Sequence, residues 1–422
     1  MHKRQRSAQV SGFLLSLVFG LLLGGLLPSY RVATAHSQTN ERGATAIARQ
    51  FGNDAVATAR RQRLTNLVDQ AEMVVRGHVA ETRSVWRAAE RQIETIVTID
   101  VRYTVLGVAP KSLQVHTAGG FLTDRGIGMV SMHAATFVPD EEVLLFLYQQ
   151  DEQRNQRMQD TTATSTREDA QWQLVAGAAG KFIVRGDKAV NQDGMIVETV
   201  DTLLHTVATL ATTRQAITTP LTTLLQQTAL STQHEAVPAY TMEGQTEKRR
   251  WATPHAGVNY YVNINTDQVD EHKAGKESST LRNAVMAAAE QWSTVDSADF
   301  TLRYGGPTTA TSTGYNGVSE ILFMHKGHKE RAAAAEVWYT KDLTVVEADI
   351  WINDDYRWDA SGTPAFNEVD LESALIHEFG HWLILGHLAQ PQSIMYPRLA
   401  AGSVKRQLQS EDIAGISAIY PR

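Results

Sequence analysis

The chain contains no cysteine among its 422 residues. Disulfide bonds are therefore excluded as a source of stability, and packed hydrophobic cores must supply it instead. A basic stripe is also missing, and the formal net charge at neutral pH is −7. Because nucleic-acid-binding proteins need clustered lysine and arginine side chains to neutralise phosphates, we exclude nucleic acid as a partner.

The first 35 residues are typical of an export signal. Residues 2–6 read HKRQR, residues 11–27 are a largely apolar run, and residues 33–35 have the small side chains of a cleavage site. The apolar run is close to the lower length limit for a membrane-spanning helix. Residues 1–35 are therefore either a signal peptide or an uncleaved N-terminal anchor. Both alternatives place the folded part outside the cell, as a secreted protein or as one anchored in the membrane.

The rest of the chain has the composition of a globular protein, with 43% hydrophobic and 20% charged residues, and its length allows two or three domains. We predict four segments: an N-terminal extension (36–59), an all-β domain with a closing helix (60–215), a Thr- and Gln-rich linker (216–250) and an α+β domain (251–422). The linker ends in Arg249-Arg250, which is either a processing site or a solvated charge run.

The all-β domain is predicted from strands that alternate apolar and polar side chains. The clearest pattern covers residues 93–105, and further strands are expected at 73–79, 112–116, 143–148 and 181–185. Apolar residues at helical spacing follow at 200–210. We expect an antiparallel sandwich or a partly open barrel, closed by this short helix.

Histidines in the all-β domain occur singly, at His78, His116 and His133. A lone histidine on a strand is more often structural than a metal ligand. We therefore predict no catalytic site in this domain. Its role stays open between an accessory binding module, a substitute for a propeptide and a cell-surface spacer.

The stretch HEFGHWLILGH, residues 377–387, carries the strongest functional signal. His377 and His381 are four residues apart, so on a helix their side chains share one face and can hold one metal ion. Glu378 lies beside this pair but points away from it, where it can deprotonate a water. His387 adds a third imidazole. A helix with histidines and no metal is the alternative reading.

These residues resemble the metzincin metalloproteases, whose pattern is H-E-x-x-H-x-x-G-x-x-H followed by a methionine turn, here SIMYP with Met395. H-E-F-G-H and M-Y-P are most similar to the matrixins. The resemblance implies a twisted mixed sheet, a long active-site helix and a C-terminal helix at 408–420. It implies one zinc ion held by His377, His381 and His387. It also implies Glu378 as general base, Met395 beneath the metal, and Tyr396 and Pro397 in the wall of the substrate pocket.

Three departures from the family pattern affect the prediction. Ile384 stands where metzincins have the glycine through which the chain leaves the helix, and positive φ is costly for a β-branched residue. Gly386 offers another place for the turn. Many matrixins also use a propeptide cysteine to block the zinc, which this chain lacks. No His/Asp-rich loop for structural zinc and calcium is recognisable, so calcium stays possible but unsupported, and His325 and His328 fit a surface loop better than a site.

The sequence thus predicts an exported zinc endopeptidase that hydrolyses peptide bonds with a zinc-activated water and a glutamate base. Substrate would bind extended along a strand edge near residues 333–339. Its partner is a protein or peptide, a membrane only if residues 1–35 stay uncleaved, and its oligomeric state is undetermined. Two alternatives are open: a non-catalytic or weakly active surface binding protein that keeps the fold, and a zinc hydrolase of non-peptide amides.

Overall fold

The computed structural model describes residues 58, 60–149, 171–192, 196–212, 249–263, 265, 278–326, 331–388 and 390–422. The chain divides into two units, residues 1–58 and 59–422, and all elements below belong to the second. The expected signal or anchor, nearly all of the extension and most of the linker lie outside the described residues. In the part that is described, no helix is both long enough and apolar enough to cross a membrane.

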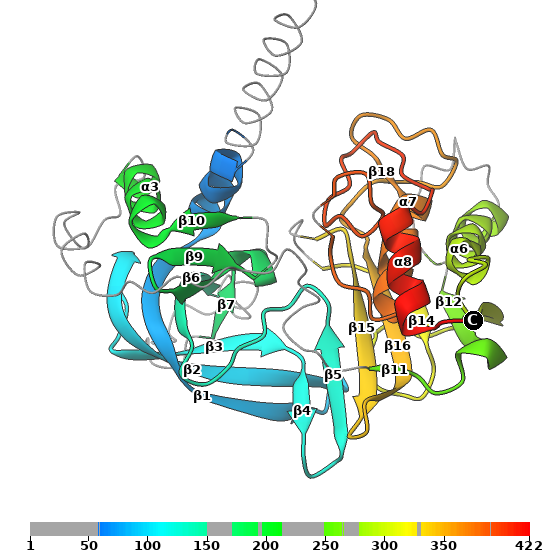
Figure 1. Ribbon diagram of the computed structural model, residues 1–422, viewed down its shortest axis with the longest axis horizontal. Coiled ribbons are helices and arrows are strands. Elements are labelled where there is room, and N and C mark those ends of the chain that lie inside the picture. Colours follow the sequence, from blue (N-terminus) through cyan, green and yellow to red (C-terminus); the bar gives the residue numbers. More distant parts are fainter. Residues whose placement is uncertain are drawn as a thin grey trace, which may run out of the picture. The chain divides into compact units, whose positions relative to one another are not determined.

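The N-terminal region is built on one eight-stranded sheet (Figure 1). Its strands are β1 (Met73–Arg87), β2 (Gln92–Leu106), β3 (Ser112–Ala118), β6 (Glu142–Gln149), β7 (Trp172–Leu174), β8 (Lys181–Arg185), β9 (Lys188–Asn191) and β10 (Val197–Thr199). Their order is β1-β2-β3-β7-β6-β8-β9-β10, and β6 also pairs with β1. The pairings therefore close a circuit through β1, β2, β3, β7 and β6.

Alternation along β2 places its apolar side chains on a buried face. On β2, Ile93, Val97 and Ile99 are buried, whereas Asp100 is exposed, as the sequence pattern predicts. Helix α3 (Val200–Thr212) begins after β10, and a short 3-10 turn, η2 (Gly177–Gly180), precedes β8. The helix buries an apolar stripe that contributes to one core, formed by Val200, Leu203, Leu204, Val207 and Ala211. Residues 60–70 are also helical and bury Leu64, Leu67 and Val68 in the same core.

The C-terminal region has a second sheet, which is mixed. Its own strands are β11 (Arg250–Trp251), β12 (Val258–Asn263), β13 (Leu302–Pro307), β14 (Glu320–Met324), β15 (Ala333–Thr340) and β16 (Thr344–Asn353). β12, β13, β14 and β16 pair in parallel, while β15 is antiparallel to β16. A 3-10 turn, η3 (Pro254–Ala256), precedes β12. A separate small sheet consists of β17 (Trp358–Asp359), which pairs in parallel with β18 (Val369–Asp370).

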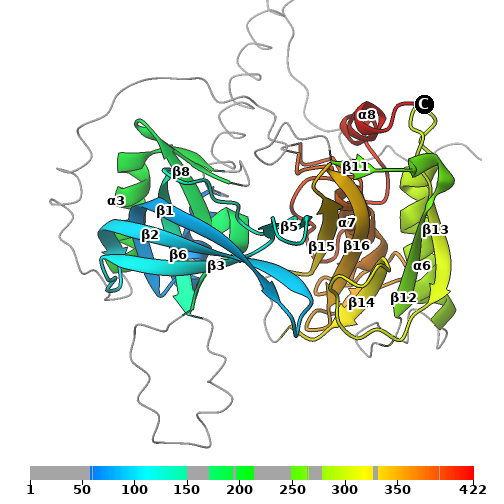
Figure 2. The same ribbon diagram turned by 90° about the horizontal axis from the view of Figure 1, so that it is seen from below.

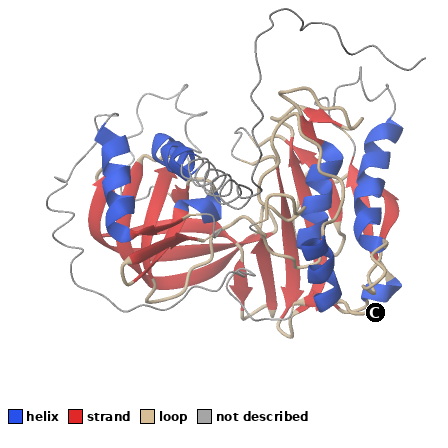
Figure 3. Cartoon of the chain, turned by 45° about the horizontal axis from the view of Figure 1, so that its top comes forward, coloured by secondary structure: helices blue, strands red, loops and turns tan. Residues whose placement is uncertain are grey.

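Among the residues that the structure describes, three helices accompany this sheet: α6 (Ser278–Ser293), α7 (Leu371–Trp382) and α8 (Ser410–Ile419). Figure 3 shows α6 and α7 running alongside the strands. Trp292 of α6 is fully buried and donates its indole N–H to the carbonyl of Ile376 on α7, at 2.8 Å. Phe379 and Trp382 of α7 are fully buried in the same core. The expected mixed sheet with helices, and the expected separate β-rich N-terminal region, are both confirmed.

One hairpin departs from the predicted separation of the two regions. β4 (Gly120–Leu122) and β5 (Ile127–Ser131) belong to the N-terminal region by sequence, but they extend the C-terminal sheet in the order β16-β15-β5-β4. β5 pairs antiparallel with β15, from Ser131 opposite Glu336 to Ile127 opposite Thr340. Figure 2 shows β5 beside β15. These strands are short and rich in glycine, so their sequence carries little strand signal.

Candidate metal centre

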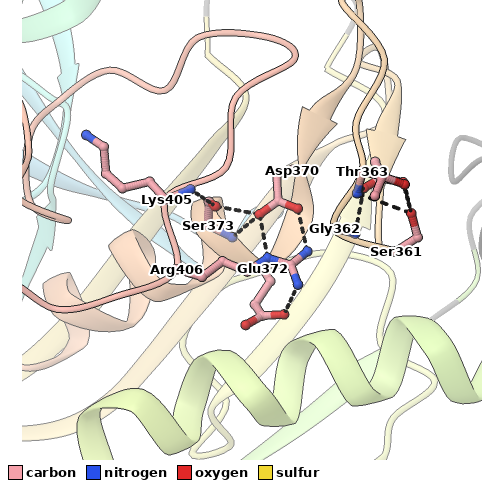
Figure 4. Close-up of polar contacts among 9 residues, drawn as sticks. Ser361, Gly362, Thr363, Asp370, Glu372, Ser373, Lys405 and Arg406 are labelled. Carbon is pink, nitrogen blue, oxygen red and sulfur yellow. Dashed lines mark hydrogen bonds and ion pairs between the residues drawn. The ribbon is translucent and has the colours of Figure 1, made fainter. Parts of the chain in front are cut away.

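The start of α7 is fixed by Asp370, which is fully buried. Its carboxylate accepts a hydrogen bond from the backbone N–H of Ser373 at 2.9 Å, as an N-cap residue does. Arg406 approaches both oxygens of Asp370, at 3.0 and 2.5 Å, and also pairs with Glu372 at 2.7 Å (Figure 4). This network fixes the register of the helix that carries the predicted metal ligands.

His377 and His381 face each other across one turn of α7, with their Nε2 atoms 3.1 Å apart. Each Nδ1 lies beside a backbone carbonyl: that of Ile394 for His377, at 2.8 Å, and that of Leu385 for His381, at 2.7 Å. A ring nitrogen beside a carbonyl must carry the proton. The two Nε2 lone pairs therefore point at each other, an arrangement that a shared cation stabilises.

Helix α7 ends in a turn that contains Ile384 at φ +65°. The N–H of Ile384 donates to the carbonyl of His381 at 2.9 Å, and that of Leu385 to Gly380 at 3.1 Å. These are the two bonds of a Schellman C-cap, with isoleucine in the position that usually holds glycine. Gly386 has no positive φ, so the idea that it takes over the turn is wrong.

The turn brings His387 back to the helix. Its ring centroid lies 5.2 Å from that of His377 and 4.9 Å from that of His381. Its Nε2 is buried and has no hydrogen-bond partner among the described residues. An unsatisfied buried nitrogen is costly, whereas a metal ion would satisfy it. The strained turn at Ile384 therefore does not displace the third predicted histidine.

A fourth histidine joins this group from the N-terminal region. His133 follows β5, and the ligand atoms of His133, His377, His381 and His387 all lie within 4.8 Å of one another. The prediction that His133 stands alone is therefore wrong. No sequence signal would have found it, because it lies far from the HEFGH motif in the chain and shares no spacing with it.

Burial holds the pKa values of His133, His381 and His387 well below the ordinary histidine value, and neighbouring positive charge acts in the same direction. Arg331 is the neighbour that contributes most for His133. These three rings are therefore neutral at neutral pH, which is the form that binds metals. Four histidine nitrogen donors at this spacing fit a zinc ion.

Glu378 points into the same space. It is 4% exposed, and its Oε1 lies 3.6 Å from Nε2 of His133. Its Oε2 is buried without a hydrogen-bond partner in the described part of the chain. A buried carboxylate with one unoccupied oxygen beside a histidine cluster is placed to accept a proton from a small molecule bound there.

Met395 packs directly under α7. It is 1% exposed, and a Cβ built on Gly380 would lie 2.3 Å from its sulfur and 2.9 Å from the ring of Trp292. Glycine at position 380, between the two helical histidines, therefore allows Met395 to lie close to the helix backbone.

The methionine turn is held by Asp412, the third residue of α8, which is 1% exposed. Its carboxylate accepts hydrogen bonds from the hydroxyl of Ser393 at 2.5 Å and from the N–H groups of Ile394 and Met395 at 2.9 and 3.1 Å. The carbonyl of Ile394 in turn orients His377. Sequence reasoning identified α8 but not this connection to the cluster.

A pocket of about 560 Å³ opens beside the histidines. Tyr396 and Pro397, predicted to line a substrate pocket, both lie in its wall together with His377, Glu378 and His387. The N-terminal region contributes His133, Ala176, Ala178 and Ala179 to the same wall. Arg63, also from that region, donates to the hydroxyl of Tyr396 at 3.2 Å.

The other histidine pair considered above does not form a comparable group. His325 is exposed and pairs with Asp355 at 2.7 Å, while His328 lies outside the described residues. Within the described ranges, the four-histidine cluster is the group of histidine or acidic side chains with metal-binding spacing.

Comparison with known proteins finds similarity between the region of this centre and one family. Residues 263–421 match the family model described as Matrixin. Metalloendoproteinase 2-MMP of Arabidopsis thaliana is 48% identical over 52 residues, which are 12% of this chain and 14% of that protein. Metalloendoproteinase 1 of Glycine max is 42% identical over 70 residues (16% and 23%), and Matrilysin of Homo sapiens is 32% identical over 78 residues (18% and 28%). The chain thus spans between 14% and 28% of the length of these relatives.

Proposed function

Because residues 263–421 form a matrixin domain, we propose that this chain is a zinc-dependent endopeptidase. The observation that carries the proposal is the convergence of His377, His381 and His387 with the carboxylate of Glu378. Their Nε2 atoms would hold the zinc ion. Bound there, zinc would supply a Lewis acid that polarises the scissile carbonyl and makes water nucleophilic near neutral pH.

The chain's own groups provide the proton transfers. Glu378 has one buried oxygen with no partner in the described region, so it can accept the proton of the attacking water and deliver it to the leaving amine. The carbonyls of Ile394 and Leu385 keep both helical imidazoles oriented with Nε2 inward. Met395 is assigned the apolar floor beneath them, because it is buried against Gly380.

Substrate would lie extended along β15. This strand pairs with β16 on one side. Its other edge pairs with β5 in this structure, so an added substrate strand could form backbone hydrogen bonds there only after β5 is displaced. Tyr396 and Pro397 line the pocket beside the histidines, which supports their role in receiving a substrate side chain. The proposed partner is accordingly a protein or peptide.

We further propose the domain boundaries and location that the sequence suggests. The closed circuit of β1, β2, β3, β7 and β6 supports a partly open barrel within residues 60–215, ahead of a catalytic domain at 251–422. Residues 1–35 would direct export. Arg250 and Trp251 form β11 and pair with β16, which argues against proteolytic processing at Arg249-Arg250, because cleavage there would sever a paired strand.

The test combines metal content with peptide hydrolysis in the full chain. We expect one zinc per chain in the wild type and in Glu378→Gln, and less zinc in His381→Ala. Hydrolysis of a casein-type substrate should appear once the N-terminal block described below is removed, and Glu378→Gln should abolish it. Hydrolysis that survives in Glu378→Gln would exclude its role as base. A zinc-loaded chain that never hydrolyses peptides, even with the N-terminal block removed as described below, would favour the alternative of a surface binding protein.

A further inference from the structure

The edge of β15 that a substrate needs is already occupied. β5 pairs with it over five residue pairs, from Ser131 opposite Glu336 to Ile127 opposite Thr340. Beyond the strand, the N–H of Met132 continues the pattern by donating to the carbonyl of Ala335 at 3.1 Å. With β16 on one side of β15 and β5 on the other, no backbone edge is left for an extended peptide.

The next residue along this segment reaches the metal centre. His133 has its ligand nitrogen within 4.8 Å of those of His377, His381 and His387. Catalytic zinc sites keep one position open beside three protein ligands, whereas four protein ligands close the site. With zinc bound, a fourth imidazole would therefore take the position that water needs. Nε2 of His133 lies 3.6 Å from Oε1 of Glu378.

We propose that His133 is a fourth zinc ligand and that residues 127–133 hold this chain inactive by filling both the open metal position and the substrate edge. The inference rests on the proposed function and adds its regulation. Because this chain has no cysteine, a histidine would block the metal here, in the role that a propeptide cysteine has in many matrixins.

Contacts on both sides hold His133 in place. Its backbone carbonyl accepts a hydrogen bond from Arg331 at 2.8 Å and one from the N–H of Ala178 at 3.0 Å. Met132 is 6% exposed and packs into the core of the C-terminal region. A Cβ on Gly177 would lie 2.4 Å from the carbonyl oxygen of His133, so this position requires glycine. The segment is thus built into both regions rather than resting on the surface of one.

Binding of acetohydroxamate tests the metal position independently of the substrate edge, because this small chelator needs an open position on the metal but no strand edge. We expect His133→Ala to bind it more tightly than the wild type, by about tenfold to a hundredfold, as expected when a position that is open in only a few per cent of molecules becomes permanently open. In cobalt-substituted protein, the visible spectrum should change between wild type and His133→Ala. Gly177→Ala displaces the same loop and should shift both readouts in the same direction. His78→Ala is the matched histidine control.

Peptide hydrolysis by the full chain tests the inhibitory effect. Gly128→Val should weaken the β5 pairing, because a Cβ there lies 2.3 Å from the ring of Tyr339. Combined with His133→Ala, it should raise the rate more than either change alone, while Asp124→Ala, an exposed change in the same hairpin, should not. Equal acetohydroxamate affinities and equal cobalt spectra for wild type and His133→Ala would overturn the fourth ligand.

The two proposals fail differently. Hydrolysis by the wild type that depends on Glu378 and equals that of His133→Ala would keep the protease and refute the block. A gain of acetohydroxamate affinity in His133→Ala without hydrolysis by any variant would keep the metal ligand and refute the protease.

Discussion

At the scale of single residues, Ile384 carries backbone strain close to the metal centre. Its φ of +65° costs a β-branched residue about 1–2 kcal/mol relative to glycine, although its side chain packs partly against the core. We predict that Ile384→Gly raises the free energy of unfolding by roughly 1 kcal/mol, measured by urea titration. Ile384→Ala keeps the positive φ and loses packing, so it should destabilise. A loss of stability in both variants would show that packing outweighs strain.

Gly380 is the second residue with a specific steric role. An added methyl group would lie 2.3 Å from the sulfur of Met395. Overpacking of this kind costs about 1–3 kcal/mol, so we predict that Gly380→Ala lowers both stability and zinc affinity. Met395→Ala alone should cost about 2–5 kcal/mol. The double variant should be less destabilised than the sum of the two, and strict additivity would contradict the contact.

The residues of the motif could be proposed from the sequence because helical spacing alone puts His377 and His381 on one face. His133 could not, since its contribution depends on where a strand from another region ends. The role of Asp412 could not be predicted for a similar reason: a carboxylate at the third position of a helix looks like an ordinary cap. Chemistry that depends on local spacing is readable from sequence, whereas chemistry assembled across the fold is not.

At the scale of elements, α8 acts on the metal centre through the methionine turn. Asp412 binds the N–H groups of Ile394 and Met395, and Ile394 orients His377. Changes to groups that orient metal ligands typically lower metal affinity by about tenfold to a hundredfold. We predict a loss of this size for Asp412→Asn in competition with a zinc chelator. Glu411→Gln, at the half-buried neighbouring residue, is the control, and equal affinities for both variants would contradict this connection.

The loop before β14 is held by buried carboxylates of β16. Glu347 is fully buried and accepts hydrogen bonds from the N–H groups of Asn316 and Gly317. Burial raises the pKa of Glu347 to about 7 from its ordinary 4.5, although those amides oppose the shift. Between these values the unfolded chain releases a proton that the folded chain keeps. This carboxyl group therefore lowers stability as the pH rises through that window.

A change at this position should reveal its share of the pH dependence. We predict that the stability of Glu347→Gln falls less than that of the wild type between pH 5 and pH 8, measured as the urea midpoint at each pH. The carboxyl group affects stability between its pKa in the unfolded chain, about 4.5, and its pKa in the folded chain, about 7. Glu81→Gln, an exposed glutamate on β1, is the matched control. Parallel profiles for wild type and Glu347→Gln would show that the carboxyl group is ionised in the folded chain throughout.

The elements found from sequence were the long ones. Patterns at 73–79, 93–105 and 143–148 fall within β1, β2 and β6, and the matrixin resemblance is confirmed over residues 263–421. Short strands such as β4 and β7, with three residues each, escaped because so few residues carry no period. β5 was missed as well, and it is the strand that joins the two regions.

At the scale of the whole molecule, the two regions share a core as well as a sheet. Trp338 of β15 is fully buried among Ile93, Leu122, Ile127 and Met129 of the N-terminal region. We predict that residues 59–422 unfold in one calorimetric transition, and that Trp338→Ala, at a cost of about 3–5 kcal/mol, divides it into two. Phe146→Ala should destabilise the N-terminal core while leaving this junction intact. Two transitions in the wild type would contradict the coupling.

The pairing of β5 with β15 joins two parts of the same chain, and this determines how the inhibitory segment responds to dilution. An inhibitory segment in the same chain acts at a fixed effective concentration, on the order of millimolar for a short tether, however dilute the protein is. Once the chain is cut between the two regions, the segment becomes a separate molecule and its occupancy falls with protein concentration. Activation of the cut protein is then a matter of dilution as much as of cleavage.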